Sequence, residues 1–516
     1  MRQWVVALVA ILAVCTGAAG KGQSSQPAPK APAPKALASK PAGRSEPKAP
    51  APKPSRGPRP ALGSNKGILT PCSLWKRRRR TGLAPLPAEA GSVSVAWPIF
   101  ACFAYFLSVA LTAPAMPALC NSLANADSST RVSAAGVTLM GTFQSVDQLM
   151  TFLFDPLWGA VSDHVGRKPL QLLACFGVTA GWGTVALSRS LPTLLLGRAV
   201  DGVTSCMLPM CQSAIKDITP PEQLVQKLGL LQGIAVGAAF IVGGVSGGVL
   251  SKLRGPREVF ALAASTALVA GILIALFAPE TLPKHRRAPR VAWGRANAMA
   301  AFAQLGQTRT SLCASAALLL FWLGLNGLQV NMYNYANFRF GWEPSTAVGL
   351  QAGSGVVLAL SNVLGPQLLA PRIGDTGVIR FGMLLFAVCL LAMGLSSSGA
   401  GFALAVLSSS VATMCLPGLT GIIAQSAAPG QVGAMLTALD SVSTLDRLLA
   451  YKLMSKLFAW GIENEQPSVH FFAGSAFVLL GWLCFEYMVK AAAEVQASPL
   501  PVSPASVRRA NAPSRK

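Results

Sequence analysis

Long apolar blocks recur along most of this chain, and they restrict its fold more than any other feature. From about Trp97 to Val489, apolar stretches of about 20 residues alternate with short polar segments. A helix of about 20 residues is about 30 Å long, which matches the hydrocarbon core of a bilayer. We count twelve blocks, at residues 95–117, 134–157, 169–188, 192–213, 228–250, 258–278, 312–333, 346–369, 377–396, 401–424, 432–458 and 470–490. One block would suit a soluble core helix, but twelve in succession predict an all-α polytopic membrane protein with twelve transmembrane helices.

A basic segment separates the blocks into two sets of six, so we expect two six-helix bundles. The blocks are rich in Gly, Ala and Ser, which allow helices to pack closely in lipid. Two repeated bundles around a site near the bilayer midplane are typical of transporters. The predicted parts are a signal-like apolar segment (1–20), a disordered basic leader (21–92), an N-terminal bundle (93–278), a basic interbundle loop (279–311), a C-terminal bundle (312–490) and a disordered basic tail (491–516).

The net charge of +24 does not indicate a nucleic-acid partner. Residues 21–92 hold 15 Lys and Arg against 2 acidic residues, whereas residues 93–489 hold 22 against 16, so much of the excess lies in the leader. We expect the lipid bilayer and a small-molecule substrate as partners, and a monomer. The cysteines lack paired metal-ligand spacing and the three histidines lie far apart, so the sequence predicts no disulfide framework, no metal site and no cofactor.

The N-terminus supports two interpretations. The first 20 residues have a basic start, an apolar core and small residues near a cleavage point, as a secretory signal does. Loop charges place both termini and the interbundle loop on the cytosolic or equivalent side, whereas a simple secretory signal would export the KRRRR tract at 76–80. A two-part plastid leader removes this conflict and predicts the plastid envelope. A disordered cytosolic tail is the alternative, with the plasma membrane or another endomembrane as the location.

One hairpin, GAVSDHVGRK, concentrates charge between two apolar blocks. Gly159 is expected to let the second helix approach a neighbour, and Gly166 to allow a tight turn. Asp163 lies where one helix ends, and Arg167 and Lys168 begin the next. We expect this charged hairpin to act as a gating latch that binds another helix end at the membrane interface. A merely solvated loop would explain the two cations but requires neither Asp163 nor both glycines.

The hairpin resembles the signature loop of the major facilitator superfamily, G-x-L-[AS]-D-R-x-G-R-[KR], with His164 where that pattern has Arg. Further segments resemble the tetracycline-type drug/proton antiporters of that family: PAMP (114–117), GRAVDG (197–202), KDITPPEQ (216–223), PETLP (279–283) and RFGWEP (339–344). The resemblance covers about 95–490 and implies that Asp217 partners the hairpin. The chain departs from the antiporter pattern in the fifth helix, where Gly244 replaces Pro, and the second copy of the hairpin is reduced to RIGD.

Charged residues within the apolar blocks are the candidates for ion coupling. A carboxylate near the bilayer centre costs about 2.5–3.5 kcal/mol on insertion scales, so it is usually retained for a pathway or a pair. Asp147 lies in the middle of the second block, and Gln144 and Gln148 form a polar stripe beside it as substrate candidates. Arg198 is the expected partner, with Asp201 three residues along. A carboxylate alternately paired with Arg198 and released would bind and lose a proton as the bundles rock; a purely structural ion pair is the alternative.

The seventh block ends in NGLQVNMYNYANF, which is rich in hydrogen-bonding groups. Asn326, Gln329 and Tyr333 are three and four residues apart, so we expect them on one side of a helix facing the substrate. Polar contacts between helices are the alternative. In the eleventh block, Asp440 and Arg447 share a face, and we expect them to form a structural pair.

These features predict a secondary active transporter that moves a small organic solute by alternating access, with proton-coupled export as the first choice. No G-x-x-x-x-G-K-[ST] segment is present to hold ATP phosphates, and GVSGG (244–248) lies inside a predicted membrane helix, so we expect no enzymatic activity. The alternatives are a uniporter or symporter of a metabolite, and a non-transporting membrane receptor or scaffold of the same fold.

Overall fold

The computed structural model describes residues 94–127, 129, 131–291, 305–427 and 432–497. The described residues all belong to one compact unit of the chain. These residues form helices and turns without a β-strand, which confirms the all-α class. The signal-like segment and the basic leader lie outside the described residues, as do much of the interbundle loop and most of the C-terminal tail.

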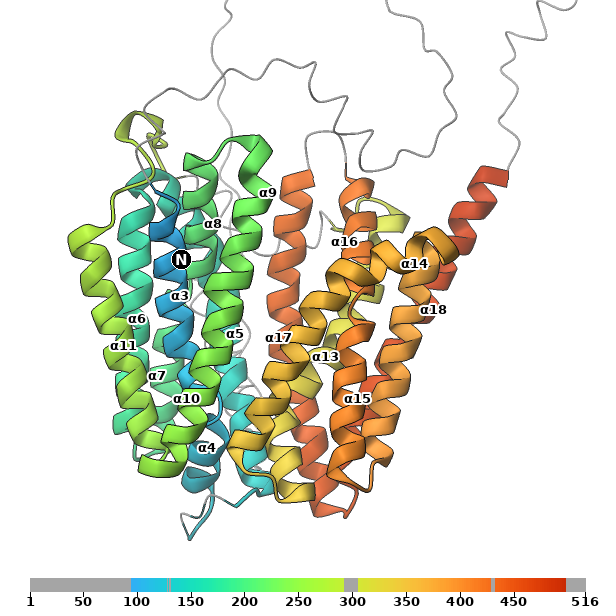
Figure 1. The fold of residues 1–516 in the computed structure, drawn as a ribbon, viewed down its shortest axis with the longest axis horizontal. Helices are drawn as coiled ribbons and strands as arrows, with labels where there is room; N and C mark the ends of the chain where they lie inside the picture. The colour runs from blue at the N-terminus through green and yellow to red at the C-terminus, as the bar shows by residue number, and fades with distance from the viewer. Residues whose placement is uncertain (1–93, 128, 130, 292–304, 428–431, 498–516) are drawn as a thin grey trace, which may run out of the picture. The chain divides into compact units, whose positions relative to one another are not determined.

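The helices of the first half form the N-terminal bundle (Figure 1). They are α3 (Ala96–Thr112), α4 (Met116–Ala124), α5 (Ala134–Val165), α6 (Arg167–Leu187), α7 (Leu191–Thr204), α8 (Met207–Ile218), α9 (Pro221–Leu230), the π-helical segment η2 (Leu231–Ala238), α10 (Ala239–Arg254) and α11 (Pro256–Phe277). A short 3-10 helix, η3 (Lys284–Arg286), follows them.

The helices of the second half form the C-terminal bundle. They are α13 (Arg309–Phe340), α14 (Pro344–Leu395), α15 (Gly399–Ala412), α16 (Cys415–Ser426), α17 (Val432–Glu463) and α18 (Val469–Ala497). The α14 segment contains two of the predicted blocks. Between them, Gly374 breaks the helical backbone with φ = 73°, a conformation that favours glycine. The residue boundaries predicted above for the two bundles remain predictions.

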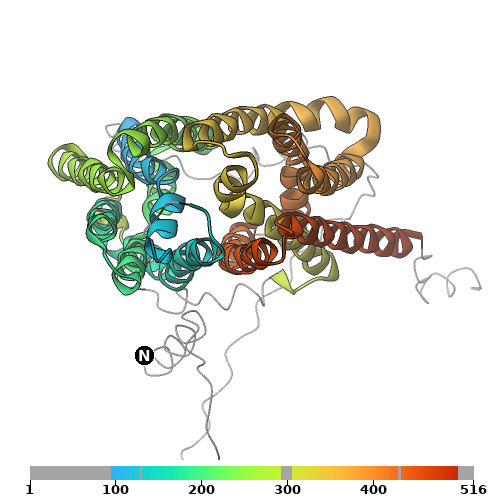
Figure 2. The ribbon, with the colours of Figure 1, turned by 90° about the horizontal axis from the view of Figure 1, so that it is seen from below.

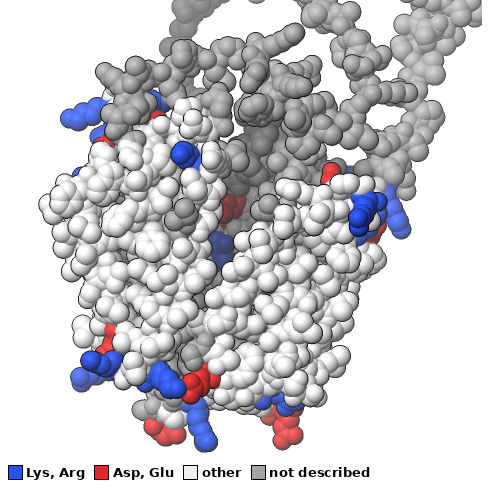
Figure 3. Space-filling model, viewed as in Figure 1, with Lys and Arg blue, Asp and Glu red and all other residues white. Residues whose placement is uncertain are grey.

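Several helices are long and apolar enough to cross a membrane. Among the described residues there are eight such segments, or nine if α3 and α4, bent by 41° at their junction, form one span. The helices α5 and α17, which carry buried charged and amide groups, are not among those eight. All twelve predicted blocks overlap described helices, so the twelve-span architecture is consistent with the structure. In the view of Figure 3, charged side chains gather toward the two ends of the described body, with a broad uncharged belt between them.

Each half has its own apolar core. Buried side chains of α3 to α11 form one core around Trp182 and Phe260. The other core gathers around Phe321, Phe386 and Tyr335 from α13 to α18, and Val137 of α5 joins it. The two bundles meet where α5 packs along α17 and α10 packs along α14 (Figures 1 and 2).

Side-chain caps fix where several helices begin. The side chains of Ser133, Thr308 and Ser398 accept hydrogen bonds from backbone N–H groups three residues later, at the starts of α5, α13 and α15. These caps satisfy backbone donors that a helix start otherwise leaves unpaired.

A charged cavity between the two bundles

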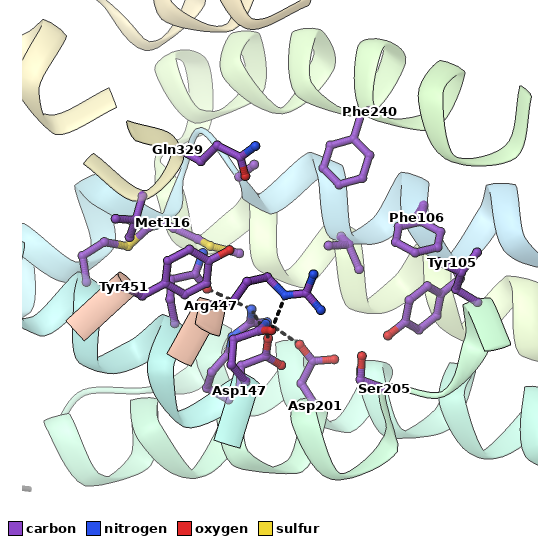
Figure 4. Close-up of a pocket in the computed structure, with 18 of the residues that line it drawn as sticks. Tyr105, Phe106, Met116, Asp147, Asp201, Ser205, Phe240, Gln329, Arg447 and Tyr451 are labelled. Atoms are coloured by element: carbon purple, nitrogen blue, oxygen red, sulfur yellow. Dashed lines mark hydrogen bonds and ion pairs between the residues drawn. The ribbon is translucent and has the colours of Figure 1, made fainter. Parts of the chain in front are cut away.

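A cavity of about 400 Å³ lies where the two bundles face each other. Residues of α3, α5, α7 and α10 line one side, and residues of α13, α14 and α17 line the other. Figure 3 shows a hollow between the halves with acidic and basic atoms inside it, and Figure 4 shows the lining side chains. The lining residues proposed from the sequence are Gln144, Asp147, Gln148, Arg198, Asp201, Gln329 and Tyr333. Most of the predicted coupling and substrate residues therefore lie around one cavity.

Arg198 on α7 is the centre of a buried charge cluster. Its Nη2 lies 3.0 Å from Asp147 Oδ2, and its Nη1 forms an ion pair with Asp201 one helical turn away. Nη2 also donates a hydrogen bond of 2.9 Å to Gln144 Oε1. The guanidinium lies over the rings of Phe143 and Trp182, 5.3 and 5.0 Å from their centroids, where cation–π attraction adds to the ion pairs.

The charges of this cluster do not balance. Arg198 is 6% exposed and faces two carboxylates, Asp147 and Asp201, which are also buried. Asp201 Oδ1 has no hydrogen-bond partner among the described residues. Two carboxylates thus contact one guanidinium, and Arg447 adds a second positive charge to the same cavity without contacting either carboxylate.

Gln148 connects this cluster to the opposite bundle. Its Nε2 donates a hydrogen bond of 2.7 Å to Asp147 Oδ2, and its Oε1 accepts one of 2.9 Å from Arg447 Nε on α17. Asp147 and Arg198 both belong to the N-terminal bundle, so rigid rocking of the bundles does not by itself separate them, and the alternation expected from the sequence stays a prediction. The Gln148 carboxamide directly links Asp147 to Arg447 of the C-terminal bundle.

Arg447 is a cavity residue that the sequence analysis assigned wrongly to a structural pair with Asp440. The Asp440 side chain is exposed, and no described ion pair joins it to Arg447. Arg447 instead binds Gln148 and, through Nη2, Thr444 Oγ1 at 3.0 Å. The spacing of the charges on α17 did not reveal this, because it says nothing about which neighbour each side chain faces.

The polar end of α13 divides between two roles. Gln329 and Tyr333 line the cavity, and the Tyr333 hydroxyl donates a hydrogen bond to Gln351 Oε1 of α14. Asn326 does not line the cavity: its Nδ2 donates a hydrogen bond of 3.0 Å to Asp446 Oδ2 in the packed interior. In this conformation Asn326 therefore does not face the cavity beside Gln329 and Tyr333 and makes the polar contact between helices that was the alternative; a role for it in substrate binding stays a prediction.

Aromatic and methionine side chains complete the cavity walls, and the sequence analysis missed them. They are Tyr105, Phe106, Met116, Met140, Met207, Phe240 and Tyr451. Phe106 and Phe240 meet across α3 and α10, with ring centroids 6.0 Å apart. Nothing in the sequence distinguishes these residues from the other apolar residues of the membrane helices.

The charged hairpin forms a compact set of contacts at the end of α5 and the start of α6. Arg167 Nη1 lies 2.9 Å from Asp163 Oδ1, and its Nε lies 2.9 Å from Asp217 Oδ2 at the end of α8. Nη1 also donates a hydrogen bond of 2.5 Å to Ser162 Oγ. The hairpin thus meets the end of another helix, as expected, and Arg167 is 8% exposed and packed against its partners; its place at the membrane interface stays a prediction.

Glu280, which the sequence analysis did not single out, holds the start of α6. Its Oε1 accepts a hydrogen bond of 2.9 Å from the Arg167 N–H, and its Oε2 accepts one of 3.2 Å from the Lys168 N–H. Lys168 Nζ donates a hydrogen bond of 2.9 Å to the Ala275 carbonyl on α11. A carboxylate at a helix N-terminus satisfies free N–H groups and interacts favourably with the helix dipole. This joins the hairpin to the segment that follows α11.

The two hairpin glycines differ in their surroundings. Gly166 has φ = 119°, and an added Cβ would meet the Glu280 carboxylate and the Arg287 guanidinium. An added Cβ at Gly159 would meet nothing within 4 Å. The close helix approach expected at Gly159 is therefore absent from this conformation, whereas the tight turn at Gly166 is present.

Comparisons with known proteins identify relatives of this chain. The sequence profile of the Major Facilitator Superfamily matches residues 98–451. The human protein called major facilitator superfamily domain-containing protein 10 is 27% identical over 332 residues, which cover 60% of this chain and 70% of that protein. The class D tetracycline resistance protein of Salmonella ordonez is 26% identical over 351 residues, covering 67% of this chain and 86% of that protein.

Solved structures show the same fold. The crystal structure of the human organic anion transporter MFSD10 (TETRAN) matches with a TM-score of 0.56 and 21% identity, covering 78% of this chain and 100% of that chain. An inward-facing, unoccupied bacterial homologue of the human lysosomal transporter Spinster matches with a TM-score of 0.62 and 14% identity, covering 79% and 99%. At these identities the likeness concerns the fold alone.

Proposed function

The chain belongs to the major facilitator superfamily, and from that premise we propose that it is a secondary active transporter of a small organic solute. The observation that carries the proposal is the cavity between the bundles, which combines charged, amide and aromatic side chains from both halves. Its volume of about 400 Å³ lies within the range of roughly 300–1,000 Å³ typical of small-molecule sites. Rocking of the bundles would expose this site to each side of the membrane in turn, which is alternating access.

We propose that transport is coupled to protons at the cluster of Asp147, Arg198 and Asp201. With one guanidinium beside two buried carboxylates, these three residues by themselves carry an excess negative charge, which a bound proton would neutralise. Among its members, Asp147 alone also binds Gln148, which reaches the other bundle, so we assign coupling to Asp147 with Asp201 as its companion. Proton-coupled export agrees with the resemblance to tetracycline-type antiporters.

The contacts of the charged hairpin support the proposal that it is a gating latch. Arg167 joins Asp163 and Asp217, while Glu280 joins the start of α6 to the segment after α11. All of these groups lie in the N-terminal bundle or directly after it. We propose that the hairpin, with Lys168 and Gly166, holds this end of the bundle as one piece during the conformational change.

Two competing functions are tested by one experiment. Purified full-length protein in proteoliposomes is given tetracycline, xylose or naphthalene-2-sulfonate, with and without a pH gradient. Proton-coupled transport predicts accumulation that depends on the gradient, whereas a uniporter only equilibrates a solute. If none of the three solutes, nor an extended panel of radiolabelled metabolites, crosses faster than in empty liposomes, a receptor or scaffold replaces the transporter.

The membrane in which the protein resides depends on the leader. If residues 1–92 form a cleaved two-part presequence, the mature protein begins shortly before Trp97 and lies in the plastid envelope. N-terminal sequencing of the protein from its native membrane tests this. A start at Met1 favours the cytosolic tail, and a start near Lys21 favours a simple secretory signal, with the plasma membrane or an endomembrane as the location.

A further inference from the structure

The cavity contains a cation whose charge is not matched by a nearby carboxylate. Its charged lining residues are Asp147, Asp201, Arg198 and Arg447. Both carboxylates are committed to Arg198. Within the part of the chain that the structure describes, no carboxylate lies within the 4.0 Å of an ion pair from Arg447. Arg447 therefore differs from Arg198, although both guanidinium groups face the same cavity.

Two acidic residues near Arg447 do not line the cavity. Asp446 of α17 does not line the cavity, and its Oδ2 accepts a hydrogen bond from Asn326 Nδ2. Asp155 and Asp446 are near enough to interact with Arg447 electrostatically, but neither lies within ion-pair distance of it and neither lines the cavity. Asp147 and Asp201 share the cavity with Arg447, but among the described residues neither lies within ion-pair distance of its guanidinium.

The guanidinium also retains donors for a ligand. Its hydrogen bonds to described residues use Nε, toward Gln148, and Nη2, toward Thr444. Figure 4 shows the Arg447 side chain among the cavity residues, with Asp147 and Asp201 drawn below it and the rings of Tyr105, Phe106 and Phe240 in the same cavity. A guanidinium in a cavity that aromatic rings also line suits an anionic group attached to an apolar or aromatic body.

We propose that the cavity binds organic anions, and that Arg447 anchors their carboxylate, sulfonate or phosphate group. The proposal rests on the proposed function, because it names the substrate class of the same cavity. An anion at Arg447 competes with Gln148 Oε1 for the guanidinium. Since Gln148 also donates a hydrogen bond to Asp147, binding of the solute changes the surroundings of the coupling cluster without touching it.

The test is direct binding of three naphthalene compounds of similar size to the purified full-length protein in detergent, measured by calorimetry. Naphthalene-2-sulfonate carries the anion, 2-naphthylmethanol is neutral and 2-naphthyltrimethylammonium is a cation. We expect the sulfonate to bind most tightly, and Arg447→Gln to weaken it by about tenfold or more, the effect of losing a charge-assisted hydrogen bond. Arg447→Lys should retain part of the affinity, because the positive charge remains.

Two control variants test whether Arg447 binds the anion directly or only holds other side chains in place. Arg380→Gln removes a guanidinium that pairs with Glu486 outside the cavity, and it should leave the sulfonate affinity unchanged. Gln148→Leu removes the group that Arg447 holds, and it should weaken the sulfonate much less than Arg447→Gln does. If Arg447 acted only by holding Gln148, Gln148→Leu would weaken the sulfonate as much as Arg447→Gln does. A folded Arg447→Gln protein has the same elution profile as the wild type in size-exclusion chromatography.

The outcomes distinguish this inference from the proposed function. Equal binding of all three compounds to the wild type, or absence of sulfonate binding, overturns the anion site, even if xylose or tetracycline is transported. An unchanged sulfonate affinity in Arg447→Gln overturns it as well. If the sulfonate binds through Arg447 but no solute crosses the proteoliposome membrane, the anion site stands and the transport function fails.

Discussion

Gln148 on α5 accepts a hydrogen bond from Arg447 on α17, with 2.9 Å between Oε1 and Nε, and so joins the two bundles at the cavity. The same carboxamide donates to Asp147. A movement of α17 relative to α5 would therefore disturb Gln148, and through Gln148 the buried charge cluster. This relationship gives the coupling proposal a physical path that the ion pair within one bundle lacks.

The first prediction compares the two hairpin glycines. Gly166→Ala should lower stability by about 1–2 kcal/mol or more, because φ = 119° is strained for alanine and the new Cβ meets Glu280. Gly159→Ala lies in a helix and meets nothing within 4 Å, so it should be neutral or stabilising by about 0.5–1 kcal/mol. Thermal unfolding of both variants in detergent tests the difference. Equal destabilisation by the two substitutions would contradict this description of the turn.

The second prediction concerns the partners of Arg167. Arg167→Ala leaves the carboxylate of Asp217 without its ion-pair partner, and loss of one member of such a buried pair costs about 3–5 kcal/mol. Asp163→Asn changes a side chain that is 46% exposed, and it should cost about 1 kcal/mol or less. Both variants should transport more slowly than the wild type. Melting temperatures measured beside initial rates check the order, and near-wild-type rates in both would remove the latch role.

The third prediction concerns Lys252 and Glu343, which form an ion pair of 2.8 Å between α10 and the start of α14. The pair joins the two bundles, but both side chains are more than half exposed. Lys252→Gln should therefore change the free energy of unfolding by no more than about 1 kcal/mol, and added salt should reduce the difference. A loss of several kcal/mol, insensitive to salt, would show that the contact is more important than its exposure indicates.

The sequence predicted the all-α fold and most of the charge cluster, because both follow from local differences between apolar and polar or charged residues. Asp147 and Arg198 stand out as charges within apolar blocks, and Gln144 and Gln148 follow from their spacing relative to Asp147. Their pairing across α5 and α7 is one of the few ways to bury such charges in a membrane protein. The turn at Gly166 was also predictable, because a glycine between two helical segments often ends the first helix.

The remaining site residues depend on tertiary contacts that spacing does not specify. Asn326 and Tyr333 share a helix face, but seven residues separate them by about 10 Å along the axis, so they meet different neighbours. Glu280 reaches the Arg167 N–H from a segment more than a hundred residues later in the chain. Arg447 turns toward the cavity rather than toward Asp440 because of how α17 is rotated against α5, and the sequence of α17 alone does not give that rotation.

The most direct test of the account is accumulation of a transported solute in proteoliposomes, driven by a pH gradient, in the wild type, Asp147→Asn and Asp201→Asn. Each substitution leaves one carboxylate beside Arg198, so the cluster is neutral without a proton. The account predicts that both variants still exchange labelled for unlabelled solute but no longer accumulate it when the gradient is applied. Accumulation at the wild-type level in both variants, with exchange intact, would contradict proton coupling at this cluster.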